Sequence, residues 1–132
     1  MSDDGLIKAQ SAFSVRETID RFVAFVQSHG LMVFARIDHA DGAAEAGLAL
    51  RPTELLIFGH AKGGTPLMAE RQTVGIDLPV KALAYEDAAG KVWLTCNDAA
   101  WIARRHGLGA ASAEAVRAIA GGIAAAMKAA TE

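Results

Sequence analysis

The sequence predicts one α+β domain over residues 1–132, with a single mixed or mostly antiparallel sheet and helices packed on one face of it. Three observations lead to this class. The chain has 132 residues, 52% of them hydrophobic, which suits one domain with a core that needs no disulfide or metal. Strand-like and helix-like patterns alternate in the order β-α-β-(α)-β-α-β-β-α-α. The last two strands follow each other across a short turn, and a hairpin implies antiparallel pairing.

The first half of the chain is predicted to begin with a strand and a capped helix. Residues 5–13 alternate weakly and are assigned to the strand. Ser14 and Glu17 then stand at the spacing of a capping box, which satisfies free backbone N–H groups at the start of a helix. An apolar stripe at helical spacing follows: Val15, Ile19, Phe22, Val23 and Val26. Gly30 suits the left-handed conformation that ends a helix.

Two further strands are predicted before the middle of the chain. Residues 31–39 read LMVFARIDH and alternate as a strand does. An Ala-rich segment, with a short helix at residues 43–46, separates them from the segment TELLIF at residues 53–58. Pro52 marks the start of this strand, because proline has no N–H to give to the ladder.

The second half is predicted to hold a helix, a hairpin and two more helices. Thr65 is expected to cap the first helix, with Pro66 at its first position. VKALAYED and KVWLTC are expected to pair across residues 88–90. Asn97 or Asp98 is expected to cap the helix that follows.

The chain is predicted to finish with a helix over residues 112–130, after Gly107 ends the preceding one. Its apolar stripe is Val116, Ile119, Ile123 and Met127. Gly121 and Gly122 interrupt this helix at a cost of about 1 kcal/mol each relative to alanine. A close helix crossing or a kink would account for the pair.

The two faces of the predicted sheet differ in polarity. One is expected to be apolar and to pack against the helices: Leu31, Val33, Ala35, Ile37, Val80, Ala82, Ala84, Val92 and Leu94. The other is mixed: Met32, Phe34, Arg36, Asp38, Lys81, Leu83, Tyr85, Trp93, Thr95 and Asn97. A large apolar patch with a polar rim is typical of an interface or a ligand groove. We therefore expect a homodimer through this mixed face, with a small-ligand cleft at its seam.

Charge and composition disfavour several classes of protein. Lys and Arg number 13 against 15 Asp and Glu, a net charge of −2 without a basic stripe, so nucleic acid is not an expected partner. Uncharged apolar segments fall well short of the roughly 20 residues of a membrane span, and the first ten residues have no apolar secretory core. No membrane partner is expected. One cysteine fits a reducing compartment, so we expect a cytoplasmic protein.

Two motifs with reactive residues have simpler interpretations. DHADG at residues 38–42 could bind a metal together with His60, but no HxH, HxxxH or CxxC spacing is present, and we predict no metal site. Cys96 stands just before a predicted helix and could pair with a histidine such as His39, His60 or His106. A lone cysteine is more often a buried small hydrophobe, which is the interpretation favoured here.

A Gly-rich segment, GHAKGGTP at residues 59–66, leads into a predicted helix. Such a loop can hold an anion on its backbone N–H groups. It is not a Walker motif, because Lys62 precedes the double glycine, and no dinucleotide-binding fingerprint occurs. A flexible loop is favoured, anion binding is the alternative, and no cofactor is expected.

Charged and polar residues on neighbouring strands form the candidate ligand-binding site. They are Arg36, Asp38, Arg51, Glu54, Lys81 and Tyr85. Cross-strand ion pairs, worth about 0.2–1 kcal/mol each, are the simpler interpretation of this set. A polar cluster inside a partly apolar cleft is what a small-ligand pocket looks like, and this is the functional interpretation.

Three segments resemble the DUF302 domain family: FARIDHADGAAEAGLALRPTELLIFGH, GGTPLMAERQTVGIDLPVKALAYEDAAGKVWLTCND and ARRHGL. The resemblance covers about residues 15–108, and the C-terminal helix at residues 110–132 lies beyond its clearest part. It implies a small α+β domain that tends to pair, and no reaction. His60-Ala61 stands where the family has Asn-Pro, and Cys96 where it has an aromatic, so His60 and Cys96 are poor candidates for a shared chemistry.

Three functions remain open at this point. The first is a non-enzymatic homodimer that binds a small molecule or an anion. The second is a small enzyme that uses Asp38, Glu54 or His39 as an acid or base, which would need burial or a charged neighbour to tune its pKa. The third is a protein-interaction module without a ligand. The sequence does not decide whether the protein is an enzyme.

Overall fold

The structure, a computed structural model, describes residues 3–132. Its elements are β1 (Leu6–Ser11), α1 (Val15–Ser28), β2 (Met32–Asp38), α2 (His39–Glu45), β3 (Thr53–Gly59), α3 (Ala61–Glu70), the 3-10 helix η1 (Gln72–Asp77), β4 (Lys81–Glu86), β5 (Val92–Asn97), α4 (Ala99–Arg105) and α5 (Ala110–Thr131). Within the described residues the strands form one sheet in the order β1-β5-β4-β3-β2, with every neighbouring pair antiparallel. The predicted α+β class is confirmed, and the sheet is antiparallel.

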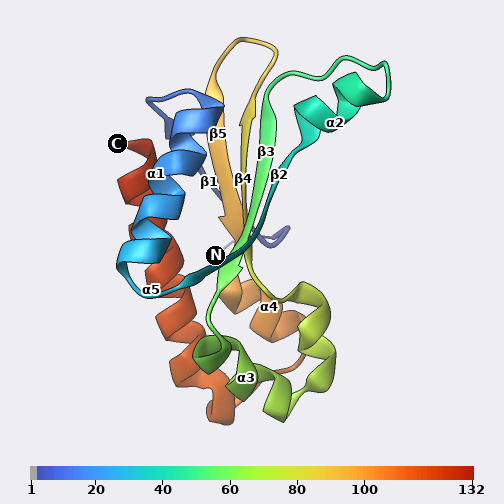
Figure 1. Cartoon of the computed structure of the whole chain (residues 1–132). Helices are drawn as coiled ribbons and strands as arrows, with labels where there is room; N and C mark the ends of the chain where they lie inside the picture. Colours follow the sequence, from blue (N-terminus) through green and yellow to red (C-terminus); the bar gives the residue numbers. More distant parts are fainter. Residues whose placement is uncertain (1–2) are drawn as a thin grey trace.

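The helices cover one face of this sheet (Figure 1). α1 and α5 lie side by side along that face, where α1 contacts β2 to β5 and α5 contacts β1 and β5. α3 and α4 gather at one end of the sheet, next to the first half of α5, and α2 projects at the other end beside β3. The opposite face of the sheet carries no helix among the described residues.

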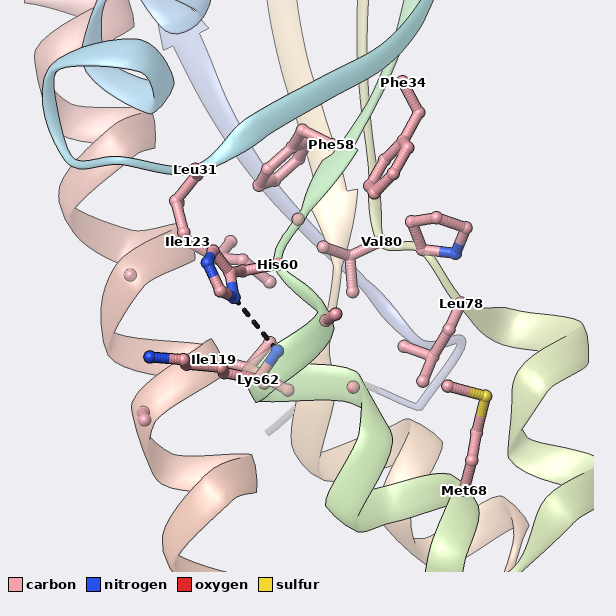
Figure 2. Close-up of a pocket in the computed structure, with 17 residues that line it drawn as sticks. Leu31, Phe34, Phe58, His60, Lys62, Met68, Leu78, Val80, Ile119 and Ile123 are labelled. Atoms are coloured by element: carbon pink, nitrogen blue, oxygen red, sulfur yellow. Dashed lines mark hydrogen bonds between the residues drawn. The ribbon is translucent and has the colours of Figure 1, made fainter.

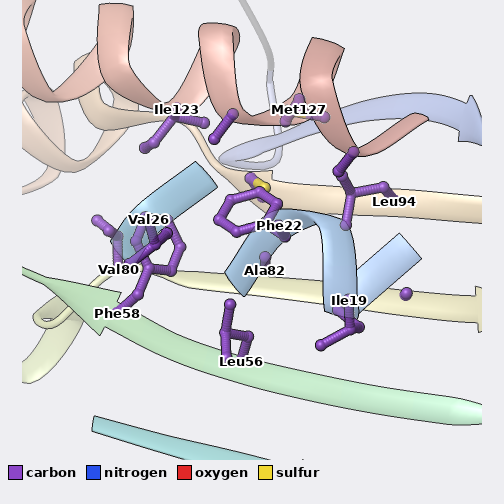
Figure 3. Packing of buried hydrophobic residues seen from close by; sticks show 14 of the residues in the cluster. Ile19, Phe22, Val26, Leu56, Phe58, Val80, Ala82, Leu94, Ile123 and Met127 are labelled. Carbon is purple, nitrogen blue, oxygen red and sulfur yellow. The ribbon is translucent and has the colours of Figure 1, made fainter. Parts of the chain in front are cut away.

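The core lies between the sheet and the pair α1 and α5 (Figure 3). Ile19, Phe22 and Val26 of the predicted stripe are fully buried. The Phe22 ring meets the Phe58 ring edge-on, with centroids 4.8 Å apart, an arrangement that adds to the stabilisation from burial alone. From α5, Ile123 and Met127 reach the same core.

The caps of the helices follow the sequence closely. Ser14 Oγ accepts a hydrogen bond from the Glu17 N–H at the start of α1, at 3.1 Å. Asp98 caps α4 through the N–H groups of Ala100 and Trp101, so of the two predicted caps the aspartate is the one used. Gly30 takes the left-handed conformation after α1, with φ of +71°, as predicted from its position.

β2 contains a register shift at Phe34 that the sequence pattern did not predict. Val33 lies opposite Phe58, and Ala35 lies opposite Ile57, so the ladder passes over Phe34. Such a bulge places one extra residue on one strand and reverses the side-chain alternation beyond it. The residues after the bulge therefore face opposite to the prediction.

The consequence is a correction to four face assignments in β2. Ala35 and Ile37 lie on the open face of the sheet, where we expected them against the helices. Arg36 and Asp38 lie on the helix side, where Arg36 reaches α1. The predicted faces of β4 and β5 are correct, since Ala82, Ala84 and Leu94 are fully buried. The pairing also shows which side chains of β3 face the helices, an orientation that the sequence left open. They are Glu54, Leu56 and Phe58.

α3 begins earlier than predicted. The helix starts at Ala61 rather than after Thr65, so Pro66 lies inside it. The cap is the side chain of His60, whose Nδ1 accepts a hydrogen bond from the Lys62 N–H at 3.0 Å. Histidine is not among the usual capping residues, and for this reason the pattern favoured the later threonine.

α5 is slightly longer than predicted and is unusually apolar. Neither Gly121 nor Gly122 has an atom of another element within 4 Å of its Cβ position, so a close helix crossing does not explain the pair. By length and composition α5 is the described helix that could cross a membrane. The sequence-based expectation counted only uncharged apolar segments and therefore missed this helix, because Glu114, Arg117 and Lys128 interrupt its apolar run. Its apolar stretch is 28% buried, and the helix packs against α1, α3 and α4.

Candidate functional site

The predicted polar cluster does not form as one group. Arg36 and Glu54 do meet: the Arg36 Nε donates to Glu54 Oε1 at 2.9 Å, and Nη1 donates to Asp20 Oδ1 on α1 at 2.6 Å. Burial alone would lower the pKa of Arg36, but the hydrogen bonds to Asp20 and Glu54 raise it above its ordinary value. This guanidinium therefore ties β2 and β3 to α1.

Asp38 lies beside this pair and serves the local backbone. Its Oδ1 accepts a hydrogen bond from the Asp41 N–H and caps α2, and its Oδ2 lies 3.9 Å from Arg16 of α1. Asp38 and Glu54 are directly opposite each other on neighbouring strands. Both carboxylates are thus engaged in structural contacts, and neither lines a described pocket.

The remaining members lie elsewhere. Lys81 and Tyr85 are on the open sheet face, away from Arg36 and Glu54. The Lys81 Nζ donates to the Pro79 carbonyl at 3.0 Å. Arg51 is exposed in the segment before β3. The expectation that these side chains meet in one cluster is wrong, because the faces of the strands separate them.

Cys96 is buried on the helix side of β5, with 1% of its surface exposed. Burial raises the pKa of its thiol well above the ordinary value, so the thiol stays protonated at neutral pH. His106 instead pairs with Asp77, with Nε2 and Oδ2 2.6 Å apart. The structure therefore supports the buried-hydrophobe interpretation of Cys96. Among residues 3–132, no three His, Cys, Asp or Glu side chains converge as metal ligands do.

A pocket of about 410 Å³ lies where α3, α5 and the ends of β2, β3 and β4 meet. Its lining residues are Leu31, Phe34, Phe58, Gly59, His60, Ala61, Lys62, Gly63, Gly64, Met68, Leu78, Pro79, Val80, Ala118, Ile119, Gly122 and Ile123. We call it the α3–α5 pocket. Its volume is within the range of about 300–1,000 Å³ typical of small-molecule sites.

The walls of the α3–α5 pocket are almost wholly apolar (Figure 2). Leu31, Ile119 and Ile123 stand on one side, with Phe34, Leu78 and Met68 on the other. Leu31, just before β2, and Ile123 of α5 are more than 90 positions apart in the chain, yet both line this space.

Glycine keeps this space open at several points. Gly63 and Gly64 belong to α3, and Gly122 to α5. A Cβ at Gly122 would meet no other element within 4 Å, although the residue lines the pocket. A longer side chain at this position would therefore enter the pocket without a clash near the backbone.

Two lining residues, His60 and Lys62, carry polar side chains, and both come from the start of α3. Figure 2 shows them on the side of the pocket that Ile119 and Ile123 form. The backbone N–H groups here are already used: Lys62 N–H donates to the His60 ring, and those of Gly63 and Gly64 donate to the His60 carbonyl at 2.9 and 3.2 Å. The first turn of α3, where a flexible loop was favoured from the sequence, therefore does not present a free cradle of N–H groups to a phosphate.

Sequence reasoning weighed this segment as an anion loop but did not find the pocket. The Gly-rich run at residues 59–66 and the Gly121-Gly122 pair were both visible signals. What the sequence could not show is that α5 lies against α3 and brings the two together.

The open sheet face is the second apolar surface. Its central side chains are Ile37, Leu55, Ile57, Leu83, Tyr85 and Trp93. Thr95 lies among them with 6% of its surface exposed, and its Oγ1 has no hydrogen-bond partner among the described residues. A buried hydroxyl without a partner is uncommon in folded proteins.

Comparison with known proteins gives one family and one fold. The family model of DUF302, a domain of unknown function, matches residues 7–127. The solved structure of an uncharacterised conserved DUF302 protein from Bacillus stearothermophilus covers 96% of this chain and 98% of its own, with a TM-score of 0.84 and 19% identity. At this identity the likeness concerns the fold.

Curated relatives come from the genus Brucella. The chain is 55% identical over 117 residues to a protein of Brucella suis named "Fluoride-specific ion channel FluC 1" and to one of Brucella melitensis named "Fluoride-specific ion channel FluC 2". These matches cover 89% of this chain but 46% and 43% of the relatives. The chain therefore spans less than half the length of the curated relatives that it matches.

Proposed function

The chain belongs to the DUF302 family, and from this premise we propose that it is a small-molecule-binding domain whose ligand enters the α3–α5 pocket. The observation that carries the proposal is an apolar space of about 410 Å³ that the side chains leave unfilled. An apolar cavity of about 150 Å³ is enough to hold benzene. Tight packing is the rule in protein interiors, so an apolar space of this size between α3, α5 and the strand ends favours a role in binding.

The glycines of the pocket provide the test. We would titrate the protein with N-phenyl-1-naphthylamine, a neutral dye whose fluorescence rises in apolar surroundings. Gly122→Leu places a side chain in the pocket, whereas Gly121→Leu makes the same change at the neighbouring exposed residue outside the pocket lining. The wild type and Gly121→Leu should bind one dye per chain, and Gly122→Leu should bind it at least tenfold more weakly.

Two results would contradict the proposed binding site. Equal dye binding by the two leucine variants would place the dye elsewhere, and absence of saturable binding to the wild type would remove the proposal. Circular dichroism of each variant shows whether the fold is retained, so that a lost site is not confused with a lost structure.

A homodimer through the open sheet face is the second part of the proposal. Its support is the apolar centre of that face, which a second copy of the chain would cover. Leu83→Glu at the centre of the face should give a monomer by sedimentation at micromolar concentration. Ala124→Glu, an equal change on the exposed side of α5, should leave a dimer. A wild-type monomer would contradict this part.

The name of the curated relatives bears on the setting of the domain. We propose that ion conduction in those proteins belongs to the larger part that this chain does not match, and that the matched part is a ligand-binding accessory domain. We also propose a cytoplasmic location for this chain, which its one cysteine, free and buried, supports. The apolar pocket supports this, because a small, strongly hydrated anion gains little from apolar walls. Millimolar fluoride should leave the melting temperature of the isolated domain unchanged, and a specific rise with fluoride over chloride would contradict the assignment.

A further inference from the structure

We infer that the ligand of the α3–α5 pocket is a carboxylate with an apolar tail, whose carboxylate pairs with Lys62 at the start of α3. The inference rests on the proposed function and adds the chemical class of the ligand. It combines two properties of the lining, an extended apolar wall and a positive charge at one side.

The apolar wall selects the tail of the ligand. Fifteen of the 17 lining residues are apolar or glycine, and they come from four different parts of the chain. A polar or charged group pushed among them would lose its water without gaining hydrogen bonds. An alkyl chain or an aromatic ring would instead be stabilised in proportion to the area that it buries.

The charge selects the head group. Lys62 is the charged residue of the lining, which includes no aspartate or glutamate. Among the described residues no ion pair involves Lys62, so an incoming anion meets a cation that is not already neutralised. Lys62 is exposed, and Figure 2 shows its side chain extended at the rim of the pocket, on the side away from Phe34, Leu78 and Met68. Its four-carbon stem is flexible, so the amino group can turn toward the head group of a bound ligand.

The hydrogen bonds in the first turn of α3 argue against a phosphate. Phosphate sites use several free backbone N–H groups at a helix start, yet here the N–H groups of Lys62, Gly63 and Gly64 donate to His60. One flexible ammonium suits a singly charged head group better than a doubly charged one. A carboxylate therefore matches the single positive charge of Lys62, and it does not need the backbone N–H groups that are already bonded to His60.

The experiment compares ligands that share a tail and differ in the head group. Decanoate, decanol and decylammonium would each compete with N-phenyl-1-naphthylamine for the wild-type protein at pH 7.5, with acetate as the head group without a tail. Decanoate should bind about threefold more tightly than decanol, which is within the range of an exposed charge pair. Decylammonium should bind more weakly than decanol, and acetate should not compete.

Lys62→Met tests the role of the charge while keeping an apolar stem. This variant should bind decanol as the wild type does but should lose the preference for decanoate. Lys91→Met, in the turn between β4 and β5, removes a lysine outside the lining and should keep the preference.

The outcomes separate the two proposals. If decanol and decanoate compete equally well with the wild type, or if Lys62→Met keeps the preference, the pocket binds apolar molecules but the carboxylate class is wrong. If neither the dye nor any of the decyl compounds binds, the proposed function fails and the ligand class fails with it. Binding of acetate alone would contradict the apolar-tail part of the inference.

Discussion

Replacing Arg36 by methionine should destabilise the domain by about 2 kcal/mol, because it leaves the carboxylate of Glu54 buried without its partner. Glu54 has 7% of its side chain exposed, Arg36 has 30%, and Nε and Oε1 are 2.9 Å apart. Breaking a fully buried pair costs roughly 3–5 kcal/mol, and we take about half of that because water reaches the Arg36 side. The contact with Asp20, which is 57% exposed, adds little.

The assay is urea unfolding followed by circular dichroism, with thermal melting as a second readout. A loss of about 2 kcal/mol should lower the melting temperature by about 8 °C for a chain of this size, and the protein should stay folded at 25 °C. Arg16→Met is the matched control, since Arg16 is 73% exposed and lies 3.9 Å from Asp38, so its loss should cost less than about 0.5 kcal/mol.

A double-mutant cycle decides whether the pair itself is responsible. Arg36→Met combined with Glu54→Leu replaces both charges by apolar groups and should recover most of the lost stability. Our explanation of this contact is refuted if Arg36→Met costs no more than Arg16→Met, or if the effects of Arg36→Met and Glu54→Leu simply add.

Three further predictions follow from other parts of the fold. The hydrogen bonds from Ser112 and from the Gly109 N–H lower the pKa of Glu70. The contribution of Glu70 to stability is therefore present above the unfolded pKa of about 4.3 and is lost as pH falls through the folded pKa. Glu70→Gln should melt below the wild type at pH 7, and the two melting temperatures should converge once the pH is below the folded pKa of Glu70. Cys96 should react with a thiol reagent at pH 8 only after unfolding, and rapid reaction of the native protein would show that burial does not protect it. Gly121→Ala and Gly122→Ala should each stabilise by about 0.5–1 kcal/mol in urea unfolding, because neither new Cβ meets another element, and a loss of stability would contradict the open space at these positions.

Local signals in the sequence predicted most of the fold. Ser14 caps α1, Asp98 caps α4, and the hairpin of β4 and β5 turns where it was expected. In that turn Asp87 accepts hydrogen bonds from the Lys91 N–H and from the Trp93 ring at 2.9 Å each. These features depend on neighbours within a few positions, and the sequence displays such neighbours directly.

The errors arise where a distant partner decides the outcome. The bulge at Phe34 exists only because β2 pairs with β3 in a particular register, and it turned Arg36 and Asp38 toward α1. The predicted cluster with Lys81 and Tyr85 then failed, because alternation along a strand cannot reveal a skipped residue. Likewise, the α3–α5 pocket depends on how α5 crosses α3, which no local pattern encodes.

The glycines of the pocket are local sequence signals whose meaning depends on contacts between distant segments. Gly63, Gly64 and Gly122 weaken the helices that contain them, and a sequence usually breaks such a local preference where function requires it. Gly122 lines the pocket whereas Gly121 does not, although both positions have room for a side chain. Stability alone would favour alanine at either position, so it cannot distinguish them. Ligand binding distinguishes the two positions, because a side chain at Gly122 takes space from the ligand and a side chain at Gly121 does not.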